Sequence, residues 1–223
     1  MVRMTTVGER AGVASPVARA LECAVSADAV DVDVDGRHVS VAILVDPVEH
    51  RRRQLAGIGA VTSTGMLHGL WLLPTGGTVP ADEIPPLKRA RFRSEPGWVS
   101  ESPRGFERLY NPAGAVIAAA VARRRPRDAL LLADALPPIL ARYVVVRAPS
   151  PTLIQDATDS GIGVITVEQD ARVLIEPRLC ETGRPAVYRW WLGEIAYEQW
   201  LQMKAQPVSC AFGSAGPLKP ACP

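Results

Sequence analysis

The sequence contains no apolar stretch long enough to cross a membrane. Its longest apolar run covers residues 113–122, far short of the roughly 20 residues that a bilayer-spanning helix needs. The first residues also show no apolar core of the kind found in signal peptides. We therefore expect a cytoplasmic protein that has no membrane partner.

Residue types that hold metals or crosslink chains are few and scattered. The four cysteines show no CxxC spacing, and the three histidines are dispersed along the chain. Neither a zinc pattern nor a disulfide framework is indicated. Lysine is scarce, so arginine supplies most of the 25 basic residues. The formal net charge of +2 is too small to imply a nucleic-acid partner by itself.

Signatures of common enzyme classes are missing as well. The sequence has no phosphate-binding GxxxxGK(S/T), no GxGxxG after a strand, no GxSxG elbow and no HExxH. Ser63, Thr64 and His68 are close in sequence, but a nucleophile and a base so near each other on a loop are usually a coincidence. We expect no catalytic residue here and no cofactor.

What is present indicates a single α/β domain over residues 1–205. The length and the hydrophobic share of 48% allow a substantial core. Residues 143–146 form an aromatic and β-branched run, which favours a buried strand. Ser150 and Pro151 then supply the cap and the first position of a helix, and residues 162–167 form a second strand. A strand, a helix and a strand joined by short links predict parallel pairing and a right-handed crossover.

The N-terminal part predicts a helix over residues 16–25, followed by a β-hairpin. Valines alternate with aspartates over residues 30–35, which is typical of a half-buried strand. An Asp35-Gly36 turn leads into residues 39–45, which are apolar on nearly both faces and so predict a central strand. We therefore expect a mixed central sheet of five or six strands, flanked by helices.

Further elements complete this expectation. A short basic helix is predicted over residues 47–56, and an alanine-rich helix with a basic end over residues 113–124. Another strand is predicted over residues 70–73, a short helix over residues 128–135 and a strong helix over residues 185–204.

Residues 74–112 stand out as a long insert rich in proline and arginine. Ten basic residues and only three glutamates lie between residues 88 and 127. A structureless loop of this length is uncommon in a compact domain, so we expect a lid, a binding arm or a partly disordered insert. Its three large aromatic residues indicate that part of it docks: Phe92, Trp98 and Phe106. Residues 206–223 are expected to form a flexible tail.

The order of the expected elements over residues 16–176 resembles that of the PD-(D/E)XK nuclease superfamily, which has the restriction-endonuclease-like fold. The similarity consists of a leading helix, a hairpin with an acidic first and an apolar second strand, a basic helix and a terminal strand-helix-strand unit. The closest match is Arg-Tyr-Val-Val-Val at 142–146 with Gly-Ile-Gly-Val-Ile-Thr-Val at 161–167. The resemblance implies a three-layer arrangement in which this last unit is scaffold.

The same resemblance implies a metal site at the hairpin. In that family, carboxylates hold Mg²⁺ and a lysine of a Glu-x-Lys pair on the second strand assists the attacking water. Asp33 or Asp35 is the candidate on the first strand, and Glu22 on the leading helix. Ala42 and Leu44 stand about where the glutamate and lysine are needed. We therefore expect a catalytically degenerate protein, with Mg²⁺ bound only if an active nuclease remains; the aspartates otherwise form a solvated strand face.

Arginine clusters provide the leading functional hypothesis, which is nucleic-acid binding through a basic surface. Phosphate contacts need only positive charge and reach, and the aromatic residues of the insert offer surfaces for base stacking. The alternative is that the arginines are solvated and the aromatic residues anchor the insert. The candidate binding residues are Arg51, Arg52, Arg53, Arg89, Arg91, Arg93, Arg123, Arg124 and Arg125.

The C-terminal helix supports a hypothesis from a different class. It holds Trp190, Trp191 and Trp200, and tryptophan is enriched at binding hot spots. The helix either caps the sheet or docks on a protein partner or a second copy of the chain, as in a non-enzymatic assembly subunit. A third hypothesis is a metal-dependent nuclease that uses Asp33 and Asp35 with a displaced basic residue.

Overall fold

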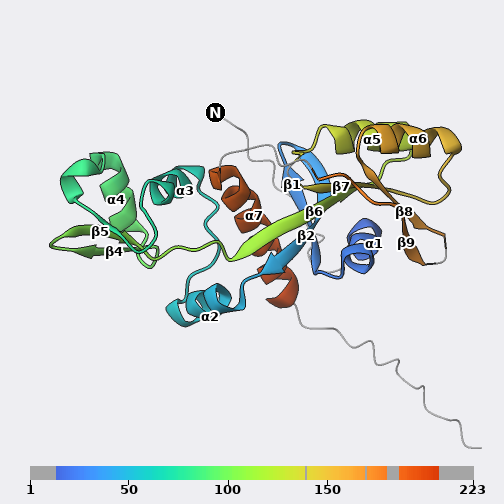
Figure 1. Cartoon of the computed structure of the whole chain (residues 1–223). Helices are drawn as coiled ribbons and strands as arrows, with labels where there is room; N and C mark the ends of the chain where they lie inside the picture. The colour runs from blue at the N-terminus through green and yellow to red at the C-terminus, as the bar shows by residue number, and fades with distance from the viewer. Residues whose placement is uncertain (1–13, 139, 169, 180–185, 206–223) are drawn as a thin grey trace, which may run out of the picture.

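The structure is a computed structural model that describes residues 14–138, 140–168, 170–179 and 186–205. Its centre is a mixed six-stranded sheet with the order β1-β2-β6-β7-β8-β9 (Figure 1). β6, β7 and β8 are parallel neighbours, whereas the other pairs are antiparallel. The expectation of an α/β protein with a mixed central sheet is confirmed.

A smaller antiparallel sheet has the order β3-β5-β4. The strands are β1 (Ala29–Val34), β2 (Arg37–Val45), β3 (Thr78–Val79), β4 (Val99–Ser102), β5 (Gly105–Arg108), β6 (Gly114–Val121), β7 (Ala141–Val146), β8 (Gly163–Val167) and β9 (Ala171–Ile175). The helices are α1 (Pro16–Val25), α2 (Pro47–Ala56), α3 (Thr64–Trp71), α4 (Pro86–Ser94), α5 (Pro126–Asp134), α6 (Pro151–Asp159) and α7 (Ala186–Ala205), with a 3₁₀ turn, η1 (Ala81–Glu83). None of the described helices is long and apolar enough to cross a membrane.

Helices cover both faces of the large sheet. α1 packs on one face, where Leu21 joins a buried cluster with Tyr143 and Ile165. α5, α6 and α7 pack on the other face, around Val144 and Val164. Figure 1 shows α1 below the sheet, with α5 and α6 above it. The chain therefore forms three layers of helix, sheet and helix.

The N-terminal hairpin forms where the sequence predicts it. β1 and β2 pair with Val34 opposite Arg37, and the turn residues Asp35 and Gly36 both adopt positive φ, 52° and 75°. The valines of β1 are buried on the α7 side of the sheet. β2 lies between β1 and β6, as its apolar residues on both faces predict.

The helix predicted over residues 113–124 is wrong, because this segment is the central strand β6. Ala118, Ala119 and Ala120 are almost completely buried, with helices above and below the sheet. Small side chains let both helical layers come close, and this tertiary packing outweighs the helix propensity of alanine. A Cβ added to Gly193 of α7 would collide with the carbonyl oxygen of Gly114, so α7 touches the backbone of this strand.

The strand predicted over residues 70–73 is also wrong, because α3 extends to Trp71. Leu67 and Leu70 point into a buried cluster together with Phe92, Trp98 and Phe106. This cluster is the core of an ordered unit formed by α3, α4 and the small sheet, which we call the insert lobe (residues 64–108). Short helices and strands thus replace the partly disordered insert that was one expectation, whereas the expectations of a lid or a binding arm stay predictions.

α7 links the two sheets. The helix predicted over residues 185–204 is confirmed from residue 186 onward, and Pro185 lies outside the described residues, as does the predicted tail. Leu192 and Tyr197 pack on the large sheet, while Val187 and Trp190 pack on the insert lobe. In Figure 1, α7 lies between the two sheets.

Candidate functional site

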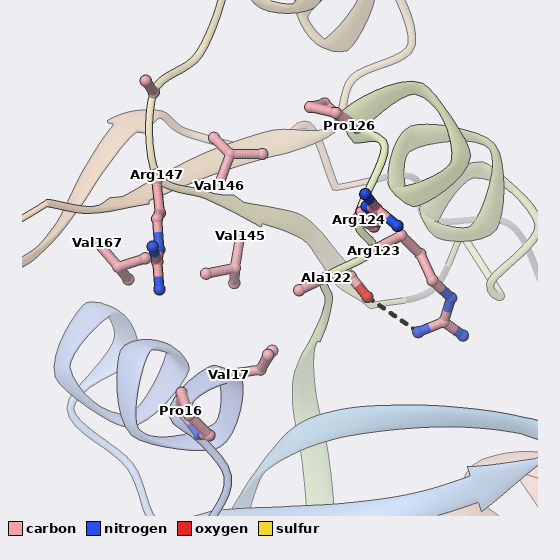
Figure 2. A pocket seen from close by; sticks show the side chains of 11 residues that line it. Pro16, Val17, Ala122, Arg123, Arg124, Pro126, Val145, Val146, Arg147 and Val167 are labelled. Carbon is pink, nitrogen blue, oxygen red and sulfur yellow. Dashed lines mark hydrogen bonds between the residues drawn. The ribbon is translucent and has the colours of Figure 1, made fainter.

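A crevice opens at the carboxyl ends of the parallel strands β6, β7 and β8. Because these strands are parallel, the segments that leave them meet at one edge of the sheet. The crevice has a volume of about 560 Å³, within the range of about 300–1,000 Å³ that is usual for ligand sites. Figure 2 shows the residues that line it: Pro16, Val17, Ala122, Arg123, Arg124, Pro126, Val145, Val146, Arg147, Ala148 and Val167.

Three arginines and no carboxylate line this crevice. Arg123 and Arg124 follow β6, and Arg147 follows β7; all three are exposed. Arg123 Nη1 donates a hydrogen bond of 2.9 Å to the carbonyl oxygen of Ala122 (Figure 2). None of the three forms an ion pair with any described residue. Their positive charges are therefore unneutralised by the part of the chain that the structure describes.

A hydrogen bond fixes the backbone of Arg147 at the end of β7. Its carbonyl oxygen accepts a hydrogen bond of 2.8 Å from the hydroxyl of Thr166 on β8, so the end of β7 is tied to the neighbouring strand. Figure 2 shows its side chain extending toward α1 between Val145 and Val167. Arg147 was not among the arginines predicted to bind nucleic acid. Its position directly after the strand predicted over residues 143–146 could have indicated that it lies at the edge of the sheet.

Helix geometry adds to the positive potential at the crevice. α1 and α5 both begin here, with Pro16 and Pro126 at their first positions, and a helix N-terminus carries a partial positive charge. Arg125 is the N-cap residue of α5 but makes no side-chain capping hydrogen bond. Asp128 is the one acidic residue in the first turn. Arginines at this end of a helix are electrostatically unfavourable in isolation, so the arrangement favours a bound anion.

The start of α1 is fixed by a polar cluster beside the crevice. The Ser15 hydroxyl caps the helix by accepting from the backbone N–H of Ala18 at 3.1 Å, and it donates to Asp31 Oδ1 at 2.9 Å. Asp31 also accepts from the backbone N–H of Ser15 and from the Ser40 hydroxyl, at 3.2 and 2.5 Å. The carboxylate of Asp31 therefore anchors α1 to the hairpin.

The candidate metal ligands are not gathered into one site. Asp33 Oδ1 accepts from the backbone N–H of Gly36 at 2.8 Å, which stabilises the turn, and Asp35 and Glu22 are exposed. Among the described residues, no group of three or more His, Cys, Asp or Glu is placed to hold a metal ion. On β2, Ala42 is buried and Leu44 is 53% exposed, and neither brings a charged group to the hairpin.

Arg53 was predicted to bind nucleic acid, and this prediction is wrong because the residue is completely buried. Its Nη1 and Nη2 each donate to a carboxylate oxygen of Glu194 at 2.7 Å, and its Nε donates to Glu49 at 2.8 Å. The guanidinium also lies over the rings of Trp98 and Tyr197, 4.7 and 5.2 Å from their centroids. No phosphate has access to this side chain.

The surroundings of Arg53 also determine its charge state. Burial alone would lower the pKa of Arg53, but the hydrogen bonds and charges of Glu194 and Glu49 outweigh it and raise the pKa. Burial, followed by the charge of Glu194, raises the pKa of the Tyr110 phenol, which donates to Glu194 at 3.1 Å. Glu194 also accepts from the backbone N–H of Val61 at 2.8 Å. The ion pair joins α2, α7 and the segments on either side of the insert lobe.

The remaining arginine candidates do not lie together. Arg51 is exposed on α2, whereas Arg52 pairs with Glu49 at 2.7 Å. Arg93 on α4 pairs with Glu101 at 2.5 Å. Arg89 is half-buried and Arg91 exposed, both on the same helix. In Figure 1, α4 lies in the insert lobe and α5 at the opposite side of the molecule.

The aromatic residues of the insert do not offer stacking surfaces for bases. Phe92, Trp98 and Phe106 are all buried in the core of the insert lobe. The prediction that they stack on unpaired bases is wrong, because they pack against residues of α3 and α7 instead. The alternative, that they anchor the insert, is confirmed.

All three tryptophans of α7 are half-buried against this chain. Trp190 packs beside Tyr110, with 5.2 Å between ring centroids, and Trp191 joins the clusters on both sides of α7. Trp200 Nε1 donates to Asp28 Oδ2 at 2.7 Å. The interpretation of α7 as a helix that caps the sheet accounts for these contacts, and docking on a partner stays a prediction.

Comparisons with known proteins add no relative. No protein-family model matches the chain, and no curated protein and no solved structure matches it significantly. The resemblance to the PD-(D/E)XK superfamily therefore stays a prediction.

Proposed function

We propose that this protein binds nucleic acid through the arginine-lined crevice at the carboxyl edge of its large sheet. The observation that carries the proposal is that Arg123, Arg124 and Arg147 all line one cavity that has no carboxylate in its lining. Phosphates are the anions that such clusters bind most readily, because each contact needs only positive charge and reach.

The protein is proposed to act as a nuclease-like scaffold without the family's catalytic set. Support comes from the order of elements, with a leading helix, a hairpin, a basic helix and a parallel strand-helix-strand unit. β2 carries Ala42 and Leu44 where a Glu-x-Lys pair is needed. Binding without cleavage is therefore the expected behaviour.

The test is fluorescence anisotropy with labelled single- and double-stranded DNA at 50 and 200 mM salt. Three neutralised phosphates predict a log–log salt slope of about −2 for single strands, which is about a 20-fold loss of affinity between these salt concentrations. The double variant Arg123→Gln/Arg147→Gln removes two contacts, so it reduces this slope by about 1.4.

A matched control is the double variant Arg89→Gln/Arg91→Gln on α4, which removes the same charge from the insert lobe. We expect it to bind DNA like the unaltered chain. If both double variants lower the DNA affinity equally, the crevice is not the binding surface. An absence of binding at 50 mM salt would also refute the proposal. Incubation with Mg²⁺ or Mn²⁺ tests cleavage in the same samples.

A further inference from the structure

The crevice is more apolar than a phosphate site requires. Eight of its eleven lining residues are proline, valine or alanine, and the other three are the arginines. A protein that only contacts the phosphates of a duplex needs charged groups on an open surface. A cavity of about 560 Å³ with apolar walls can instead enclose a small group that has both an apolar and an anionic part.

The two kinds of lining residue occupy different sides. Figure 2 shows Val17 of α1, Val145 of β7 and Val167 of β8 around one part of the opening. Arg123 and Arg124 lie on the other part, beside the start of α5. Arg147 lies on the first part, between Val145 and Val167 (Figure 2), where its guanidinium plane can face a base. The cavity therefore has one side with apolar walls and Arg147, and a second side with Arg123 and Arg124.

An intact duplex cannot use the apolar side. Its bases are stacked on one another and paired, and its outer surface presents phosphates and sugars. An unpaired nucleotide has a free base, and proteins hold such bases between apolar or aromatic side chains and against arginine planes. The polarity of the crevice matches a nucleotide with its base toward α1 and its phosphate toward α5.

We propose that the crevice binds a single unpaired nucleotide, with the phosphate on Arg123 and Arg124 and the base against Val17, Val145 and Val167. This inference rests on the proposed function and makes it more specific. The same chemistry is present in the terminal nucleotide of a strand and in a free nucleoside monophosphate. The experiment below distinguishes these two sources.

The full-length chain is titrated with a labelled ten-nucleotide single strand that carries a terminal phosphate, and with a closed dumbbell duplex that has no free end. Bound single strand is then displaced by a nucleoside monophosphate, by the nucleoside alone or by inorganic phosphate. We expect the single strand to bind at least tenfold more tightly than the dumbbell. The monophosphate should displace it at a concentration at least tenfold below that of phosphate or nucleoside.

Two variants test the cavity without changing the buried core: one fills it, and the other removes one of its positive charges. Ala148→Leu adds bulk at an exposed lining position and should weaken nucleotide binding at least tenfold with an unchanged melting temperature. Arg124→Gln should weaken the monophosphate more than it weakens the nucleoside, since it removes one charge from the side that holds the phosphate. If Ala148→Leu unfolds, the comparison of ligands on the unaltered chain still decides the question.

The outcomes separate this inference from the proposed function. Equal affinity for dumbbell and single strand, with no advantage of the monophosphate over phosphate, would overturn the nucleotide pocket and leave nucleic-acid binding intact. Tight binding of the monophosphate without binding of any oligonucleotide would uphold the pocket and refute the proposed function. Preference for the phosphorylated strand over the free monophosphate would identify a strand end as the ligand.

Discussion

Replacing Arg53 with methionine removes a buried positive charge that two carboxylates share. Glu194 is completely buried and Glu49 nearly so, and each accepts at least one hydrogen bond from Arg53. Methionine fills most of the space but offers no donor. Removing one partner of a buried ion pair costs about 3–5 kcal/mol, because the other charge is left without compensation.

This loss is large compared with the stability of a typical domain. The free energy of unfolding of native proteins is about 5–15 kcal/mol, so Arg53→Met removes a substantial part of this stability. In chains of this size, 1 kcal/mol shifts the melting temperature by about 2–4 °C. We therefore expect a melting temperature about 6–20 °C lower than that of the unaltered protein.

The assay is thermal and urea unfolding, followed by circular dichroism and by tryptophan fluorescence. Arg51→Met is the matched control, because Arg51 is exposed on the same helix, and it should change the free energy of unfolding by less than about 0.5 kcal/mol. Arg53→Met/Glu194→Gln should regain at least about 1 kcal/mol over Arg53→Met, since the unpaired buried charge is gone. An Arg53→Met variant as stable as the control would refute the role assigned to this ion pair.

Three further outcomes follow from local contacts. Gly193→Ala should destabilise the fold by about 1–3 kcal/mol through its clash with β6, whereas Gly59→Ala, which has open space, should change the unfolding midpoint little in the same urea titration. Ser15→Ala removes the cap of α1 and should cost about 0.5–2 kcal/mol by thermal unfolding. The hydrogen bond from Arg93 lowers the pKa of Glu101, so the stabilisation of the fold by this ion pair is present above the ordinary glutamate pKa and is lost as pH falls through the lowered pKa. A carboxyl NMR titration should show the pKa of Glu101 rising in Arg93→Gln.

Local patterns predicted the elements whose packing agrees with their propensity. The hairpin follows from alternating valines and from the Asp35-Gly36 turn, which has positive φ at both residues. The parallel strand-helix-strand unit follows from a capped helix between two β-branched runs. In both regions, the side chains that the sequence pattern identifies as apolar are buried in the large sheet.

Long-range contacts explain the errors. The alanines of β6 favour a helix locally, and only the layers on both sides of the sheet make them a strand. The strands of the insert lobe have two to four residues, too few to show a period. Arg53 looked like a surface residue because its partner Glu194 lies 141 positions further along the chain.

The excursion between β2 and β6 leaves and re-enters the large sheet at one point. Val45 pairs with Gly114, and the backbone N–H of Asp46 donates to the carbonyl oxygen of Ala113 at 2.9 Å. Since the entropy of closing a loop grows only slowly with its length, the sheet register is insensitive to the size of this excursion. A redesigned chain can therefore carry a longer segment here. A shortened one that loses Arg53 and the insert lobe has to replace Glu194, whose ion pair among the described residues is with Arg53, and also Val187 and Trp190, which pack on that lobe.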